Sequence, residues 1–343
     1  MKRHLNTLFV LTQGCYLAKK GQTIAVRLEK ETRLRVPIHT VGSVVCFGQV
    51  GVSPFLLGFC ADHGVPVTFL SLHGRFRARS TGRTSGNVLL RREQYRRTDA
   101  PDGGAAIARG IVLAKLVNSR ATLQRVRRNR PDAAGAREVE RAVLRLGHQL
   151  RQLSGELTLD DLRGFEGEAA RVYFSVFDHL ISQQKDDFTF QGRSRRPPRD
   201  NVNALLSFLY TLVRHDCEAA LESVGLDPAV GFLHRERPGR PSLALDLIEE
   251  LRSFLADRVA LGLINQRQVA TSGFKTAETG GVEMDDATRK TVLQAYQKRK
   301  QDELEHPFLR EKTTLGLVPH LQALLLARHL RGDLDAYPAF VPK

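Results

Sequence analysis

Apolar residues in the first 80 positions occur in short runs, and turn-forming residues separate these runs. The runs 23–28, 44–47 and 65–70 are rich in β-branched and aromatic residues, and Val10 belongs to the same series. Runs of this length and composition, bounded by glycine, are typical of β-strands. The pattern predicts a β domain in which residues 19–21 (Lys-Lys-Gly) form the tip of a hairpin.

One helix interrupts the predicted strands. Ser53 is suited to cap a helix, and Pro54 after it fits the first turn, where no backbone donor is needed. Leu56 and Phe59 follow at helical spacing, and residues 63–64 (His-Gly) provide an end. A short helix is therefore expected directly after Ser53.

The period of the apolar positions changes after about residue 105. Valine and leucine recur in steps of four, three, four and three from Val139 to Leu153, which is the stripe of an amphipathic helix. Ile107, Ile111 and Leu116 indicate a second helix, and the segments 203–213 and 321–330 are also helical in pattern. The expected fold class is α+β, with a small N-terminal β domain followed by a larger, all-α catalytic domain.

The stretch from 80 to 104 is polar and rich in turn-forming residues, which is typical of a domain boundary. We therefore predict an N-terminal β domain at 1–85, a linker at 86–104 and a C-terminal helical catalytic domain at 105–343.

Composition excludes several classes of protein. Apolar residues make up 42% of the 343 positions, enough for a sizeable core, so bulk disorder is excluded. The longest mostly apolar stretch, 204–213, is too short to cross a bilayer, and the run 8–11 is too short for a secretory signal. Four widely spaced cysteines argue against a disulfide scaffold. We expect a cytoplasmic protein that does not act in a membrane.

The charge is strongly basic and unevenly distributed. Lys and Arg number 52 against 37 Asp and Glu, which gives a net charge of +15. Between Arg75 and Arg130 there are 15 basic residues and only 3 acidic ones. Such a block attracts polyanions, so nucleic acid is the leading candidate partner. An ordinary solvated basic surface would account for the composition equally well. The role of the arginines at 120–130 stays open.

Three segments carry candidate catalytic groups. Glu166 stands among glycine and alanine, which leave room for a ligand or another backbone, although an exposed acid at a helix start is the simpler explanation. His234 lies on a loop rich in proline, glycine and arginine. A histidine there could be a metal ligand, a catalytic base or an ordinary surface residue, and the sequence does not decide among these roles.

The third segment is a helix after Ser242. Asp246 and Glu249 are three residues apart and share one face, opposite an apolar stripe, as they would on an ordinary surface helix. Taken together, however, these carboxylates and the imidazole of His234 suit Mg²⁺ or Mn²⁺ in phosphoryl chemistry. The sequence contains no P-loop, so ATP hydrolysis of that kind is not supported.

The order and spacing of several short segments resemble the Cas1 family of CRISPR-associated spacer-acquisition proteins, the DNA integrases and endonucleases of bacterial adaptive immunity. The resemblance covers nearly the whole chain, and residues 296–300 and 330–338 are most similar to the subtype I-C branch. The other matching segments are 164–167, 170–173, 196–200, 203–207, 231–234, 238–247 and 280–282.

The resemblance assigns roles residue by residue. It implies that Glu166, His234 and Glu249 bind a divalent cation, Mg²⁺ or Mn²⁺, and that Asp246 is a second acid near it, less favoured as a direct ligand. The family often has Asp where this chain has Glu249. All four residues are expected to be catalytic, with Tyr173 and Arg171 as supporting groups. The expected DNA-binding residues are Arg171, Arg195, Arg196, Arg235, Arg237 and Arg240.

The resemblance also implies partners and a reaction. Homodimers, formed largely through the N-terminal side, are expected to flank a Cas2 dimer and to hold double-stranded, branched prespacer DNA, which a Cas4 nuclease processes in subtype I-C. Each 3′-hydroxyl then attacks a phosphodiester at the repeat boundary. Two alternatives remain: a non-catalytic architectural DNA-binding subunit, and a stand-alone metal-dependent DNA nuclease.

Overall fold

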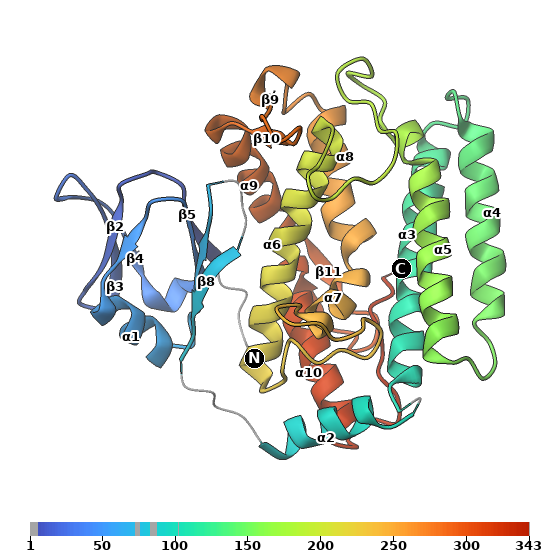
Figure 1. The fold of residues 1–343 in the computed structure, drawn as a ribbon, viewed down its shortest axis with the longest axis horizontal. Helices are drawn as coiled ribbons and strands as arrows, with labels where there is room; N and C mark the ends of the chain where they lie inside the picture. Colours follow the sequence, from blue (N-terminus) through green and yellow to red (C-terminus); the bar gives the residue numbers. More distant parts are fainter. Residues whose placement is uncertain (1–5, 73–75, 83–87, 102, 343) are drawn as a thin grey trace. The chain divides into compact units, whose positions relative to one another are not determined.

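Two structural units make up the chain in the computed structural model, which describes residues 6–72, 76–82, 88–101 and 103–342 (Figure 1). The first unit combines the N-terminal residues up to 85 with a later segment, 284–300. The second unit contains 86–283 and 301–343. The molecule is of mixed α+β class, with an N-terminal β region followed by a mainly helical region, as the sequence predicted.

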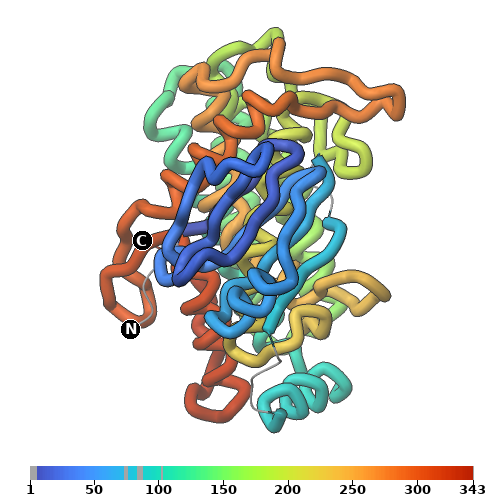
Figure 2. Tube along the Cα trace, turned by 90° about the vertical axis from the view of Figure 1, so that its left-hand side faces the viewer, coloured from blue at the N-terminus to red at the C-terminus, as the bar shows by residue number. Residues whose placement is uncertain are grey.

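The first unit contains two four-stranded sheets, in the orders β1-β5-β7-β8 and β4-β3-β2-β6. In the first sheet β1, β5 and β7 are parallel, and β8 is antiparallel to β7. In the second sheet β2, β3 and β4 form an antiparallel meander, and β6 is parallel to β2. The blue strands of this unit can be followed in Figure 2. Its elements are β1 Asn6–Val10, β2 Tyr16–Lys20, β3 Thr23–Leu28, β4 Glu31–Pro37, β5 Val41–Phe47, β6 Gly51–Val52, α1 Pro54–Asp62, β7 Val67–Leu70, β8 Phe76–Ser80 and α9 Asp286–Lys300.

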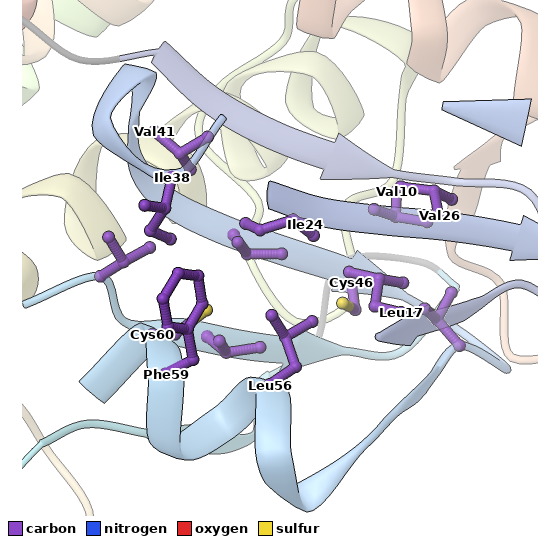
Figure 3. Close-up of a cluster of buried hydrophobic side chains, with 14 of the residues drawn as sticks. Val10, Leu17, Ile24, Val26, Ile38, Val41, Cys46, Leu56, Phe59 and Cys60 are labelled. Atoms are coloured by element: carbon purple, nitrogen blue, oxygen red, sulfur yellow. The ribbon is translucent and has the colours of Figure 1, made fainter. Parts of the chain in front are cut away.

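Helix α1 supplies part of the core of this unit. Leu56, Phe59 and Cys60 point from α1 toward Ile24 and Cys46 on the strands (Figure 3). The Ser53 hydroxyl accepts a hydrogen bond from the Leu56 amide, so the predicted cap and start of this helix are confirmed. All four cysteines of the chain lie in its described part, where they are buried and none forms a disulfide.

The second unit is built from long helices that pack side by side. Helices α3, α4 and α5 form one group, and α6 contacts α7, α8 and α10 (Figure 1). A short π-helix follows α7 and contacts α3. The elements are α2 Val88–Asp99, α3 Ala105–Asn129, α4 Ala136–Gln152, α5 Leu159–Ser175, α6 Asn201–Val224, α7 Ser242–Glu249, the π-helix Arg252–Ala256, α8 Asp257–Asn265, β9 Phe274–Thr276, β10 Val282–Met284, β11 Glu303–Glu305, β12 Lys312–Thr314 and α10 Val318–Leu330. The last residue of β10, Met284, already belongs to the first unit.

Several elements differ from the expectation. The helix α2 occupies most of the segment 86–104 that was expected to be a linker, and the two short pairs β9–β10 and β11–β12 interrupt the expected all-helical region. The helix α9, from the C-terminal half of the chain, belongs to the first unit. There Gln297 donates a hydrogen bond to the Thr7 carbonyl on β1 at 2.8 Å, and Val292 and Leu293 are buried.

Candidate active site

Helix α5 carries Glu166 in its middle. The helix begins with a capping box, in which the Thr158 hydroxyl accepts from the Asp161 amide and the Asp161 carboxylate accepts from the Thr158 amide. Glu166 is therefore two turns from the N-terminus of the helix, and its side chain is 24% exposed. The simpler explanation considered for the sequence, an exposed acid at a helix start, is wrong.

The neighbours of Glu166 on α5 have separate surroundings. Tyr173 is buried, whereas Arg171 lies on the exposed side, where it pairs with Glu168. Among the described residues, no atom outside the helix backbone and the adjoining residues lies within 4 Å of where a Cβ at Gly164 or Gly167 would stand. The glycines beside Glu166 thus leave room at this surface rather than admitting another part of the chain.

The loop that carries His234 is folded around the carboxylate of Asp246 on α7. The amides of Phe232 and Leu233 donate to Asp246 Oδ2 at 2.6 and 3.0 Å, and the His234 amide donates to Oδ1 at 2.9 Å. A Cβ at Gly231 would stand 2.9 Å from Asp246 Oδ2 and 2.8 Å from the carbonyl carbon of Ser242, so only glycine fits. Asp246 is fully buried, and both of its oxygens are used to hold this loop.

Asp246 also orients the imidazole of His234. Its Oδ1 lies 2.7 Å from His234 Nδ1. A carboxylate on one ring nitrogen fixes the tautomer and leaves the other nitrogen free to act as a ligand. That second nitrogen, His234 Nε2, lies 3.9 Å from Glu249 Oε1. Asp246 is thus placed as the group that orients His234.

The same loop is attached to α5. Arg163 donates to the Leu233 carbonyl at 2.7 Å, and Arg235 pairs with Asp160 at 2.9 Å. These bonds fix the loop against the helix that carries Glu166.

Glu249, at the end of α7, is buried among cationic groups. Its Oε2 lies 2.8 Å from Lys115 Nζ, and its Oε1 lies 3.0 Å from Arg252 Nη2. Burial alone would raise the pKa of Glu249, but Arg252, Lys115 and His234 together lower it to about 2. Glu249 is therefore an anion at neutral pH, and the sequence-based picture of a solvated surface acid is wrong.

Lys115 on α3 joins the two glutamates. Its ammonium forms ion pairs with Glu166 on α5 and with Glu249 on α7, and its side chain is buried. Lys115 was not predicted from the sequence. A signal was present, because Lys115, Asn118 and Thr122 recur at helical spacing among the buried positions of α3. Polar residues at buried positions of a helix indicate a buried polar site.

The donor set fits a hard divalent cation. Two carboxylates and one imidazole are groups that Mg²⁺ and Mn²⁺ accept, and Glu166 and Glu249 already share one positive group. Across residues 6–72, 76–82, 88–101 and 103–342, however, no three His, Cys, Asp or Glu side chains are grouped closely enough to hold a metal ion. Glu166 and Glu249 share the Lys115 ammonium, and His234 Nε2 lies 3.9 Å from Glu249 Oε1. These three candidate ligands would have to move closer together to bind one metal ion.

The candidate DNA-binding arginines fall into two sets. Arg171 and Arg235 are paired with Glu168 and Asp160. The second set, Arg195, Arg196, Arg237 and Arg240, lies around the His234 loop. Burial lowers the pKa of the Arg240 guanidinium, and the positive charges of Arg237, Arg195 and Arg196 lower it further. No helix in the described chain is long and apolar enough to cross a membrane.

Comparison with known proteins gives a consistent result along the whole chain. The family model described as CRISPR associated protein Cas1 matches residues 8–298. The CRISPR-associated endonuclease Cas1 1 of Chlorobaculum tepidum is 53% identical, over 99% of both chains. The endonuclease Cas1 2 of Rhodospirillum rubrum is 55% identical, over 98% of both chains. A Cas4/Cas1 fusion protein of Geobacter sulfurreducens is 33% identical and matches 98% of this chain and 60% of its own length.

Solved structures have the same fold. A Cas1 protein from Thermotoga maritima has a TM-score of 0.79 at 24% identity, over 96% of this chain and 97% of its own. A casposase bound to integration product has a TM-score of 0.83 at 20% identity, over 99% and 95% of the two chains. A chain of a Cas6-RT-Cas1–Cas2 complex has a TM-score of 0.81 at 21% identity, over 99% of this chain and 36% of its own length. With the family model covering most of its length and relatives above 50% identity, the chain belongs to the Cas1 family of CRISPR-associated proteins.

Proposed function

We propose that this protein is a divalent-metal-dependent DNA integrase and endonuclease of CRISPR adaptation, of subtype I-C. The main support is that three separate segments bring their candidate ligands together: Glu166 and Glu249 share the Lys115 ammonium, and His234 Nε2 lies 3.9 Å from Glu249 Oε1. The names of the relatives, which are endonucleases, support the same activity.

The proposed reaction is a transesterification. The 3′ oxygen of the incoming strand forms a bond to phosphorus while the bond from that phosphorus to the 3′ oxygen of the target strand breaks. The attacking hydroxyl loses its proton to solvent, and the departing oxygen takes one up. Glu166, Glu249 and His234 Nε2 would hold Mg²⁺ or Mn²⁺, which when bound supplies the positive charge that lowers the pKa of the hydroxyl and stabilises the phosphorane. Asp246 keeps Nε2 of His234 directed at the site.

Substrate DNA would lie against the exposed side of Glu166. The room at Gly164 and Gly167 supports this placement, and so does the group of arginines around the His234 loop. We infer that Arg195, Arg196, Arg237 and Arg240 bind backbone phosphates, while Arg171 and Arg235 reach DNA only after leaving their carboxylate partners. Phosphate contacts of this kind do not read sequence.

The proposed assembly contains a homodimer of this chain, a Cas2 dimer, prespacer DNA and Cas4. The Cas1–Cas2 complex among the similar structures supports Cas2 as a partner, and the casposase bound to integration product supports DNA. The fusion of Cas4 with Cas1 in one relative supports Cas4.

Strand transfer on branched DNA tests the proposed function. We expect Glu166→Gln and His234→Ala to abolish integration and its reversal on a branched substrate, and we expect EDTA to do the same to the wild type. Glu138→Gln is the matched control, because Glu138 is a partly exposed glutamate in the first turn of α4 and pairs with Arg141, to which no role in DNA binding is assigned. Full activity of the Glu166 variant would contradict the proposed site. Cleavage of linear duplex without strand transfer would favour a stand-alone nuclease. Metal-independent DNA binding without any cleavage or strand transfer would favour an architectural subunit.

A further inference from the structure

Lys115 occupies an unusual position for a lysine. Its side chain is buried on α3, and its ammonium pairs with one glutamate from α5 and one from α7. Buried lysines are rare unless they are paired, because removing an ammonium from water is unfavourable. Here both partners are the carboxylates that the proposed function assigns to the metal.

The helix around Lys115 is fixed against α7 and the segment after it. Asn118, one turn along α3, donates to the Glu250 carbonyl at 2.8 Å and to the Phe340 carbonyl at 2.9 Å. Thr122, a turn further on, donates to the Ser253 carbonyl at 3.3 Å. Because the backbone of α3 is held in this way, the Lys115 ammonium is placed beside Glu249 rather than reaching it by chance from a mobile surface.

Charge balance explains what the ammonium does there. Glu166 and Glu249 carry two negative charges at one place, and Lys115 and Arg252 supply two positive ones. Without Lys115 the two carboxylates would repel each other with no cation between them. With Lys115 in place, a divalent cation adds two further positive charges and needs the same carboxylate oxygens. The ammonium and the metal therefore compete.

We propose that Lys115 is a built-in cation of the active site, which holds Glu166 and Glu249 together in the metal-free protein and is displaced when a divalent cation binds. This inference rests on the proposed metal site. It makes Lys115 a positioning residue with two measurable effects. The residue stabilises the metal-free protein, and it weakens the affinity of the site for metal.

The experiment compares the full-length wild type with Lys115→Met, which keeps the length of the side chain and removes its charge. Tm is measured in EDTA and again with increasing Mn²⁺, and Mn²⁺ affinity is measured by electron paramagnetic resonance without DNA. In EDTA we expect the Tm of Lys115→Met to fall by about 5–10 °C, because two buried carboxylates lose their shared partner. Mn²⁺ should restore most of this loss and bind the variant at least about tenfold more tightly than the wild type.

Two control variants distinguish the effect of removing the Lys115 charge from a general loss of stability. Lys115→Arg keeps the positive charge and should retain most of the Tm in EDTA. Lys185→Met removes an exposed lysine that pairs with Asp178, and it should match the wild type in both measurements. If Lys115→Met is insoluble, the double variant Lys115→Met/Glu166→Gln should fold in EDTA, because it no longer contains the repelling pair; an insoluble double variant would overturn the proposal.

The outcomes also separate this inference from the proposed function. A wild type that binds no Mn²⁺ contradicts the metal site itself. A wild type that binds Mn²⁺ with the same or higher affinity than Lys115→Met contradicts only the role of Lys115. An unchanged Tm of Lys115→Met in EDTA contradicts that role as well.

Discussion

Two consecutive glutamates at the end of α7 are both buried, yet their surroundings are opposite. Glu249 faces the cationic groups of Lys115 and Arg252, and its pKa is lowered to about 2. Glu250 faces neutral donors: the Tyr337 hydroxyl at 2.6 Å, the Phe340 amide at 2.7 Å and the Gln322 amide at 2.9 Å. Burial raises the pKa of Glu250 to about 7 although these hydrogen bonds oppose the shift.

The difference shows that burial alone does not decide the role of an acid. Cations keep Glu249 charged on the side of α7 where the proposed chemistry takes place. On the other side, Glu250 binds the segment near the C-terminus that contains Tyr337 and Phe340. The end of α7 thus places a charged carboxylate, proposed to bind metal, one residue from a carboxylate that holds the C-terminal segment.

Removing the charge of each glutamate in turn tests whether the two residues have different roles. Glu249→Gln should lower strand-transfer activity by more than about 100-fold, because the site loses a proposed ligand, and losing even the support of a ligand has effects of that order. Glu250→Gln should stay within a few-fold of the wild type when rates are corrected for the folded fraction, measured by circular dichroism. Equal losses in the two variants would show that the two sides of α7 are not separate.

The stability of the protein should depend on pH in opposite ways through Glu249 and Glu250. The pKa of Glu250 is about 7 in the folded protein against an ordinary value of 4.5, so the folded state binds the extra proton. The stabilisation from this proton is complete below pH 4.5 and is lost as the pH rises through about 7. The free energy of unfolding changes by about 3 kcal/mol as a result. Glu249 acts in the opposite direction: its contribution is present above pH 4.5 and is lost as the pH falls through about 2.

Thermal unfolding of the wild type and of Glu250→Gln between pH 4.5 and 8 measures this effect. The variant should gain stability relative to the wild type as the pH rises. The groups that face Glu250 are Tyr337, Gln322, the Phe340 amide and the nearby Asp246. Parallel curves for the two proteins would show that Glu250 is ionised in the folded state throughout this range.

A third buried acid on α7, Asp246, extends the comparison, because backbone amides hold it. Gly231→Ala places a Cβ 2.9 Å from Asp246 Oδ2 and should disturb the loop that orients His234. We expect activity to fall by about 10–100-fold, as for other groups that orient a metal ligand. Gly262→Ala in α8 is the control, since no described atom outside its own helix backbone and adjoining residues lies within 4 Å of that Cβ. Similar activity of both variants would contradict the orienting role of the loop.

The hydrogen bond between Tyr337 and Glu250 should contribute modestly to stability and not to activity. Tyr337→Phe removes the hydroxyl that donates to Glu250 Oε1 and should lower the free energy of unfolding by about 1–2 kcal/mol. Its strand-transfer rate, measured well below the Tm, should match that of the wild type. A large loss of activity without a loss of stability would place Tyr337 on the chemical side instead.

The sequence predicted the candidate site residues and the helix that carries two of them, but not which side chains surround them. The resemblance named Glu166, His234 and Glu249, and the helical pattern after Ser242 predicted α7. The pattern suggested an ordinary polar surface for Asp246 and Glu249, whereas both are buried. Their partners come from elsewhere in the chain, such as Lys115 on α3, and helical periodicity describes only one element at a time.

The same limit applies to the fold. Strand β4 was missed because it is mostly exposed and rich in charge, so it carries no apolar signal. Helix α9 was assigned to the C-terminal domain because no local pattern indicates that its buried residues belong with β1. Segments whose partners are close in sequence were predicted well, as at Ser53 and α1.

The position of α9 also has a consequence for synthesis on the ribosome. The N-terminal sheets emerge first, but the helix that completes their unit ends at residue 300 of 343. The helices α2 to α8 must therefore leave the ribosome before β1 can contact α9. Until then β1 is without α9, and the growing polypeptide exposes a surface to which chaperones can bind.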